Sequence, residues 1–184
     1  ATCHKYGLYL FLDGARLGYG LAAPDNDLTL PDIAALCDVF YIGGTKVGAL
    51  FGEAVVIKNP ELAQDFRYII KQNGGMLAKG RLLGLQFDAL FTDGLYQEIS
   101  AHAIAMAEKL REAFTAKGYT YLAPNRTNQI FVIVPDAHLA KISEQFEYSY
   151  DQRIDATHSC VRFCTSWATK EENVDALIRC VEKL

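Results

Sequence analysis

An acid and a guanidinium stand close together near the start of the chain. Asp13 follows the apolar run from Leu8 to Leu12, which is typical of a strand buried on both faces of a parallel sheet. Open α/β sheets bind ligands at the carboxyl ends of such strands. A carboxylate beside apolar walls needs a cation or several donors to stay ionised, and Arg16 lies three residues further on. A structural Asp-Arg pair at the head of a loop is the alternative interpretation.

An amine that could act as a nucleophile follows a second apolar run. Asp38 to Ile42 predicts another buried strand, and Gly43-Gly44-Thr45-Lys46 comes directly after it. Small residues let the backbone approach a ligand closely, and a lysine held in a partly desolvated pocket can attack carbonyl groups. The spacing differs from that of a nucleotide-phosphate loop. A surface lysine in a glycine-rich turn is the alternative.

Together, Asp13 and Lys46 suggest a particular cofactor, because both follow strands and could face one crevice. Pyridoxal phosphate needs a lysine for its Schiff base. It also needs an acid at its pyridinium nitrogen, which keeps the ring protonated and able to take up electrons.

The elements that must position these residues are strands alternating with helices, which predicts an α/β sheet in the first part of the chain. The strands are expected over 8–13, 38–42 and 53–58, and the first helices over 30–37 and 60–71. A helical pattern from 77 to 117 predicts two helices divided near 92–94. The second of them has one apolar face, made of Ile99, Ala103, Met106, Leu110 and Phe114.

The last third of the chain predicts a small α+β unit. Strands are expected over 129–134, 148–154 and 159–165, and helices over 137–146 and 171–184.

Composition argues against several classes of partner. The 184 residues are 51% hydrophobic and carry a formal net charge of −4, which disfavours binding to nucleic-acid phosphates. The apolar runs are far shorter than the roughly 20 residues that cross a bilayer, and no export signal is visible, so we expect a cytoplasmic protein. Five cysteines without a C-x-x-C pair and four scattered histidines lead us to expect no metal site.

Three separated segments carry a resemblance to a known family. They are Leu10 to Leu17, Asp38 to Lys46, and Arg162 to Trp167. With these motifs in this order, the chain resembles the low-specificity L-threonine aldolases, in the β-eliminating lyase group of fold-type I pyridoxal-phosphate enzymes. The resemblance runs nearly end to end. It implies an α/β fold, with residues 1–80 as the C-terminal half of the cofactor-binding large domain and its mostly parallel sheet. Residues 81–184 would be the connecting helices and a small α+β C-terminal domain.

The resemblance also implies roles for four residues. Lys46 would form the Schiff base with pyridoxal phosphate, and Asp13 would pair with the pyridine nitrogen. Arg16, at the cofactor, and Arg162 would hold the substrate carboxylate, which a planar guanidinium grips with two parallel hydrogen bonds. For Arg162, which lies in an otherwise apolar segment, a strand-edge salt bridge is the alternative.

The implied activity is that of a pyridoxal-phosphate-dependent lyase, which cleaves L-threonine or L-allo-threonine to glycine and acetaldehyde. A homodimer or homotetramer is the assembly that the resemblance implies. Family members are considerably longer, so we expect this chain to be a C-terminal portion. Two alternatives stay open: a β-eliminating lyase of the tryptophanase or tyrosine phenol-lyase type, and a non-catalytic fragment that needs its missing N-terminal half. The segment from Asp13 to Arg16 favours the aldolase.

Overall fold

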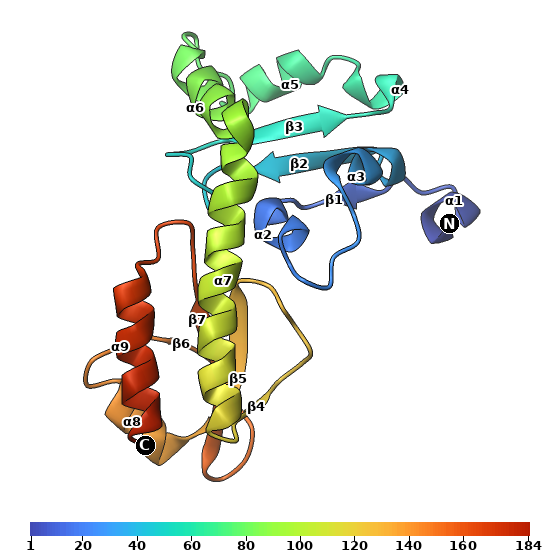
Figure 1. The fold of residues 1–184 in the computed structure, drawn as a ribbon. Helices are drawn as coiled ribbons and strands as arrows, with labels where there is room; N and C mark the ends of the chain where they lie inside the picture. Colours follow the sequence, from blue (N-terminus) through green and yellow to red (C-terminus); the bar gives the residue numbers. More distant parts are fainter. The chain divides into compact units, whose positions relative to one another are not determined.

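The computed structural model describes all 184 residues and divides into two compact units (Figure 1). Unit 1 comprises Ala1–Leu21 and Asn26–Glu98, and unit 2 comprises Ala22–Asp25 and Ile99–Leu184. Each unit has its own sheet. The units divide between Glu98 and Ile99, whereas the domain boundary expected after residue 80 stays a prediction.

Unit 1 contains a three-stranded sheet in the order β1-β2-β3, made of β1 (Phe11–Leu12), β2 (Val39–Gly43) and β3 (Glu53–Ile57). Strands β1 and β2 are parallel, as expected, and β2 and β3 are antiparallel. The antiparallel pair has a physical reason, because the short connection between β2 and β3 cannot form the long crossover that parallel strands need.

The helices of unit 1 differ from the expected ones in two places. The helix expected over 60–71 is broken at Asp65, whose φ of 57° is left-handed and cannot continue a right-handed helix. A short helix after Arg16, rich in glycine, was not expected. The helical elements are α1 (Thr2–Lys5), α2 (Leu17–Leu21), α3 (Leu30–Leu36), α4 (Pro60–Ala63), α5 (Phe66–Gln72), α6 (Arg81–Phe91) and the 3₁₀ turn η1 (Thr92–Gly94).

The first strand is not buried on both faces, which corrects the expectation from its apolar sequence. Leu8, Tyr9 and Phe11 are 60%, 58% and 58% exposed. Leu12 packs against the small core formed by α3 and β2. Successive side chains of a strand point to opposite faces, so the core covers the Leu12 face and leaves the Phe11 face open.

Unit 2 contains a four-stranded antiparallel sheet in the order β4-β5-β7-β6. Its strands are β4 (Thr120–Tyr121), which was not expected, β5 (Gln129–Pro135), β6 (Ser149–Arg153) and β7 (His158–Cys164), and its helices are α8 (Asp136–Ile142), α9 (Glu171–Glu182) and α7 (Leu95–Ala116) from Ile99 onward.

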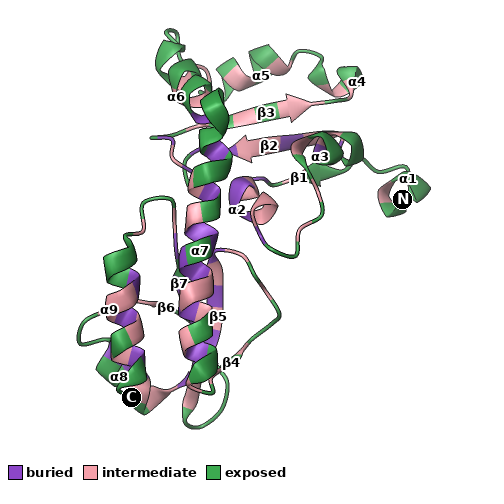
Figure 2. Cartoon of the chain, viewed as in Figure 1, coloured by how far each residue is buried: buried purple, intermediate pink, exposed green.

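The core of unit 2 lies between this sheet and the helices. The predicted apolar face of α7 is confirmed for Ala103, Met106, Leu110 and Phe114, all at most 5% exposed, and Figure 2 shows the buried stripe along the helix. Strand β5 alternates between buried and half-buried positions, as a strand packed on one face does. None of the helices combines the length and apolar character that a bilayer crossing requires.

Candidate active site

Asp13 lies at the carboxyl end of β1, beside the neighbouring parallel strand. The register pairs Leu12 with Phe40, so Asp13 comes level with Tyr41 of β2. The Tyr41 hydroxyl donates a hydrogen bond to Oδ1 of Asp13. The Ala15 amide donates to the same oxygen at 3.0 Å. One carboxylate oxygen therefore has two donors from the protein.

These contacts favour the charged form of Asp13. The Tyr41 hydrogen bond, followed by that of Ala15, holds the Asp13 pKa below its usual value, and the positive charges of Lys46 and Arg16 lower it further. The same contact, because it stabilises the protonated hydroxyl, raises the Tyr41 pKa to about 12. The electrostatics thus link Asp13 to both cations that the sequence singled out.

Lys46 lies in a tight turn after β2. The turn is closed by hydrogen bonds from the amides of Val47 and Ala49 to the Gly44 carbonyl, at 2.9 and 3.0 Å. The buried Tyr19 hydroxyl donates to the Lys46 carbonyl at 2.5 Å, which fixes the backbone at the lysine. The Lys46 residue itself is exposed, so the desolvated lysine expected from the sequence is not found. The lysine instead lies on the surface of the protein, and the contact that holds it is made by its backbone carbonyl with Tyr19.

Two glycines bring the end of β1 against the end of β2. The Gly43 amide donates to the Gly14 carbonyl at 2.9 Å. A Cβ at Gly14 would lie 1.7 Å from the carbonyl oxygen of Tyr41, a distance that no side chain can occupy. The buried Tyr96 joins the same backbone, since its hydroxyl accepts from the Gly18 amide and donates to the Gly43 carbonyl, each at 3.1 Å.

Arg16 has an unused donor. Its Nε is buried and has no hydrogen-bond partner, although buried polar groups are nearly always paired. The residue directly precedes α2, and its carbonyl accepts from the Gly20 amide at 3.1 Å, so its backbone is held in the first turn. An acceptor supplied by a ligand would satisfy this nitrogen.

Arg162 lies on β7 in unit 2. Its guanidinium donates to Gln129 Oε1 at 3.2 Å and to Ser149 Oγ at 3.4 Å, and its Nε is buried without a partner. None of the ion pairs of the chain includes Arg162. The strand-edge salt bridge is therefore absent. Instead, the two hydrogen-bond partners of the guanidinium are neutral, and its Nε has no partner.

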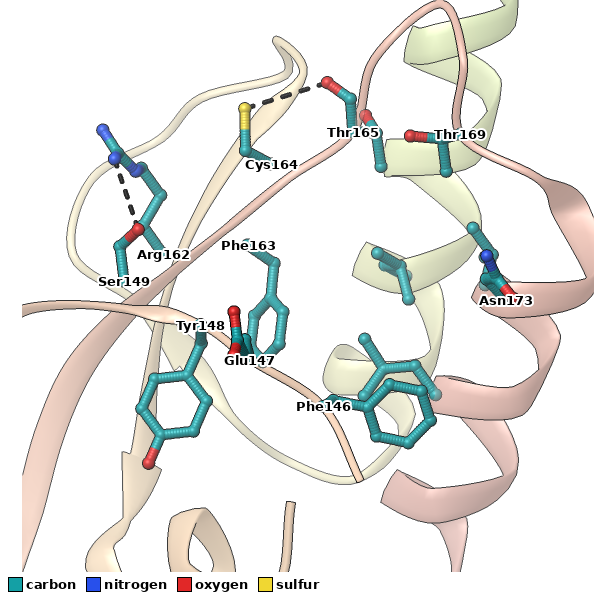
Figure 3. A pocket seen from close by; sticks show the side chains of 13 residues that line it. Phe146, Glu147, Tyr148, Ser149, Arg162, Phe163, Cys164, Thr165, Thr169 and Asn173 are labelled. Atoms are coloured by element: carbon teal, nitrogen blue, oxygen red, sulfur yellow. Dashed lines mark hydrogen bonds between the residues drawn. The ribbon is translucent and has the colours of Figure 1, made fainter. Parts of the chain in front are cut away.

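A cavity of about 370 Å³ in unit 2 includes Arg162 in its wall. Figure 3 shows Arg162 beside Ser149 on one side of the cavity and Thr169 with Asn173 on the other. Phe163 and Phe146 contribute apolar surface. The wall thus combines one cation, the exposed carboxylate of Glu147, neutral polar groups and aromatic rings.

Asp13, Arg16 and Lys46 lie in unit 1, where the charges of both cations act on the Asp13 carboxylate, and Arg162 lies in unit 2. Sequence reasoning missed three tyrosines that hold this part of unit 1 through their hydroxyls: Tyr19, Tyr41 and Tyr96. Only Tyr41 could have been noticed from the sequence, because its hydroxyl is a polar group within an otherwise apolar strand. No group of three or more His, Cys, Asp or Glu side chains is arranged to hold a metal ion.

Comparison with known proteins identifies similar chains. The low-specificity L-threonine aldolase of Pseudomonas sp. (strain NCIMB 10558) is 32% identical over 181 residues, which is 96% of this chain and 51% of the relative. The protein of the same name from Pseudomonas aeruginosa is 30% identical over 180 residues, 97% of this chain and 51% of the relative. The structure of Leishmania major threonine aldolase matches with a TM-score of 0.96 at 42% identity, over 99% of this chain and 53% of that one.

Over nearly its whole length, the chain is similar to proteins named threonine aldolase, at 30% to 42% identity. It spans about half the length of the curated relatives that it matches. No family model matches the sequence. The α/β fold inferred from the sequence is confirmed by the similarity to the Leishmania structure.

Proposed function

We propose that this chain belongs to a pyridoxal-phosphate-dependent lyase that cleaves L-threonine or L-allo-threonine to glycine and acetaldehyde. The observation that carries the proposal is the grouping of Asp13, Arg16 and Lys46 at the ends of two parallel strands, in a chain similar to proteins named threonine aldolase. Ligands bind at this edge of open α/β sheets. Because the chain spans about half the length of its relatives, we propose that it is a C-terminal portion of the enzyme.

The residues present fit pyridoxal phosphate in three ways. Lys46 offers an exposed primary amine on a fixed turn. Asp13 has two protein donors on Oδ1 and none on Oδ2, which leaves an oxygen for a ring N–H. Arg16 has a buried Nε without a partner, which suits an acceptor oxygen of the cofactor or of the substrate carboxylate.

When bound, pyridoxal phosphate supplies an aldehyde that combines with amines and a ring that takes up the electrons released at Cα. Asp13, ionised because of its donors and the nearby cations, holds a proton at the pyridine nitrogen. Lys46 would hold the cofactor covalently through Nζ. The buried Tyr19 hydroxyl holds the Lys46 carbonyl, and the buried Tyr96 hydroxyl joins the loop after β1 at Gly18 to the end of β2 at Gly43.

Arg162 is proposed to bind the substrate carboxylate together with Arg16. Its guanidinium is held by two neutral partners and retains a free buried donor. Guanidinium and carboxylate form paired, charge-assisted hydrogen bonds. The proposed substrate is an amino acid, as the names of the relatives imply. We also propose a homodimer or homotetramer, a cytoplasmic location and no nucleic-acid or membrane partner.

The test is acetaldehyde release from L-threonine and L-allo-threonine by the protein supplied with pyridoxal phosphate. Wild type is expected to release acetaldehyde and glycine, and Lys46→Ala is expected to release neither. Lys58→Ala, which removes another exposed lysine of unit 1, is the matched control and should behave as wild type. Equal activity of Lys46→Ala would contradict the proposal. Pyruvate and ammonia in place of acetaldehyde would indicate β-elimination.

A further inference from the structure

The contact between Tyr41 and Asp13 follows from the way the two strands pair. Asp13 and Phe11 are two residues apart, so their side chains point to the same face of the sheet. The Tyr41 ring lies on this face too, with its centroid 6.0 Å from that of Phe11. Its hydroxyl reaches the carboxylate one step further along β1.

The two donors to Asp13 act on a single oxygen. Tyr41 comes from the neighbouring strand and Ala15 from the loop after β1, and both bind Oδ1. A carboxylate with one oxygen held from two directions has less freedom to rotate, and Oδ2 keeps its capacity to accept. These two donors are the hydrogen bonds that orient the exposed Asp13 side chain.

From this geometry we propose that Tyr41 is a positioning residue that fixes Asp13 through Oδ1 and so presents Oδ2 to the pyridinium nitrogen of the cofactor. The proposal rests on the proposed function, since it assigns Asp13 to that nitrogen. It adds a residue that touches neither substrate nor cofactor. Without the hydroxyl, the Asp13 side chain would regain rotational freedom that cofactor binding must remove.

Charged groups near Tyr41 and Asp13 also affect the Asp13 pKa, so the test must leave them unchanged. Lys46 and Arg16 place positive charge near Asp13, and Glu53 of the paired strand β3 adds negative charge near Tyr41. Tyr41→Phe changes none of these charges and keeps the ring that contacts Phe11. A change in the Asp13 titration would therefore report the lost hydroxyl.

The experiment compares wild type, Tyr41→Phe and Tyr9→Phe in two measurements. The first is the Asp13 carboxyl pKa without cofactor, from ¹³C chemical shifts assigned with Asp13→Asn. The second is the dissociation constant of pyridoxal phosphate, from the absorbance of the bound form. Tyr9 is 58% exposed, so Tyr9→Phe controls for the loss of a hydroxyl near the same strand.

We expect Tyr41→Phe to raise the Asp13 pKa and to weaken cofactor binding roughly three- to tenfold, the cost of immobilising one side chain, while Tyr9→Phe changes neither. An unchanged Asp13 pKa would overturn the proposal, as would a shifted pKa with unchanged cofactor affinity. If wild type binds no cofactor but the Asp13 pKa still differs between wild type and Tyr41→Phe, the proposed function fails and the Tyr41 contact stands.

Discussion

At the scale of residues, the candidate site depends on tyrosine hydroxyls that form hydrogen bonds with backbone groups. Tyr96 is 1% exposed, and its hydroxyl joins the Gly18 amide to the Gly43 carbonyl. These two groups belong to segments that flank Asp13 and Lys46. The tyrosine thus links the loop after β1 to the end of β2.

Tyr96→Phe should lower the free energy of unfolding by about 1 to 3 kcal/mol, because it leaves a buried amide and carbonyl without their partner. Urea unfolding followed by circular dichroism measures the loss. Tyr68→Phe removes a hydroxyl from a residue that is 74% exposed and should change stability by less than about 0.5 kcal/mol. Equal effects of the two substitutions would show that the Tyr96 hydrogen bonds do not stabilise the protein.

The three tyrosines also show why sequence reasoning found only part of the site. Asp13 and Lys46 could be predicted because each follows an apolar run at a strand end. Tyr19, Tyr41 and Tyr96 act on residues 27 or more positions away in the chain, and no local pattern encodes such contacts. The exposure of Lys46 was missed for the same reason, since tertiary packing decides burial.

At the scale of elements, the approach of the β1 loop to β2 allows no side chain at Gly14. The Gly14→Ala substitution should cost about 3 kcal/mol or more, because the added methyl group meets the Tyr41 carbonyl and must push the backbone apart. Gly20→Ala, in α2 with open space around it, should instead gain about 0.5 to 1 kcal/mol. Urea unfolding of both variants measures the difference. A Gly14→Ala variant that is as stable as wild type or as Gly20→Ala would contradict the close approach.

The loop between β6 and β7 provides a pH-dependent contribution. Asp155 Oδ1 accepts from the amides of Thr157 and His158 at 2.7 and 2.9 Å. The Thr157 bond has the largest effect, followed by a hydrogen bond with the His158 ring at 3.0 Å, and together with the His158 amide they lower the Asp155 pKa to about 2. A carboxylate with a lowered folded-state pKa adds stability that is complete above the unfolded pKa and lost as the pH falls through the folded one.

Asp155→Asn keeps an acceptor oxygen but removes the charge. The difference in melting temperature between wild type and this variant should shrink as the pH falls from about 4 to about 2. Thermal melts across this range measure it. Asp151→Asn, an exposed aspartate in β6, controls for the loss of one surface charge. A difference that grows on acidification would contradict the assigned direction.

Element boundaries were predictable where one local signal decided them. Helix α3 begins at Leu30, as expected, and in the structure Thr29 and Asp32 form a capping box there. The helix expected over 60–71 failed because Asp65 adopts a left-handed conformation, which propensity does not reveal. Strand β4 has only two residues, too few for a periodic pattern.

At the scale of the whole molecule, most of the large apolar side chains that are exposed belong to unit 1. Leu8 and Tyr9, at 60% and 58%, are among them. Their apolar sequence predicted burial, and the sequence could not show which faces the core of unit 1 would leave open. Exposed apolar patches bind apolar molecules.

A variant with Leu8→Lys and Tyr9→Lys should therefore bind less of the dye ANS than wild type does. Fluorescence titration measures the binding. The control carries Tyr150→Lys and Ile154→Lys in unit 2, where exposed apolar side chains are fewer. If dye binding falls as much in the control as in the first variant, the exposed apolar surface is not concentrated in unit 1.

The proposed function depends most directly on Lys46. The most direct test treats the protein with pyridoxal phosphate and borohydride, digests it, and quantifies the reduced pyridoxyl group on every lysine-containing peptide by mass spectrometry. Lys46 should be labelled first and at the lowest cofactor concentration, and Lys46→Ala should lose this label while remaining folded. Labelling spread evenly over the surface lysines, unchanged by Lys46→Ala, would contradict the proposed function.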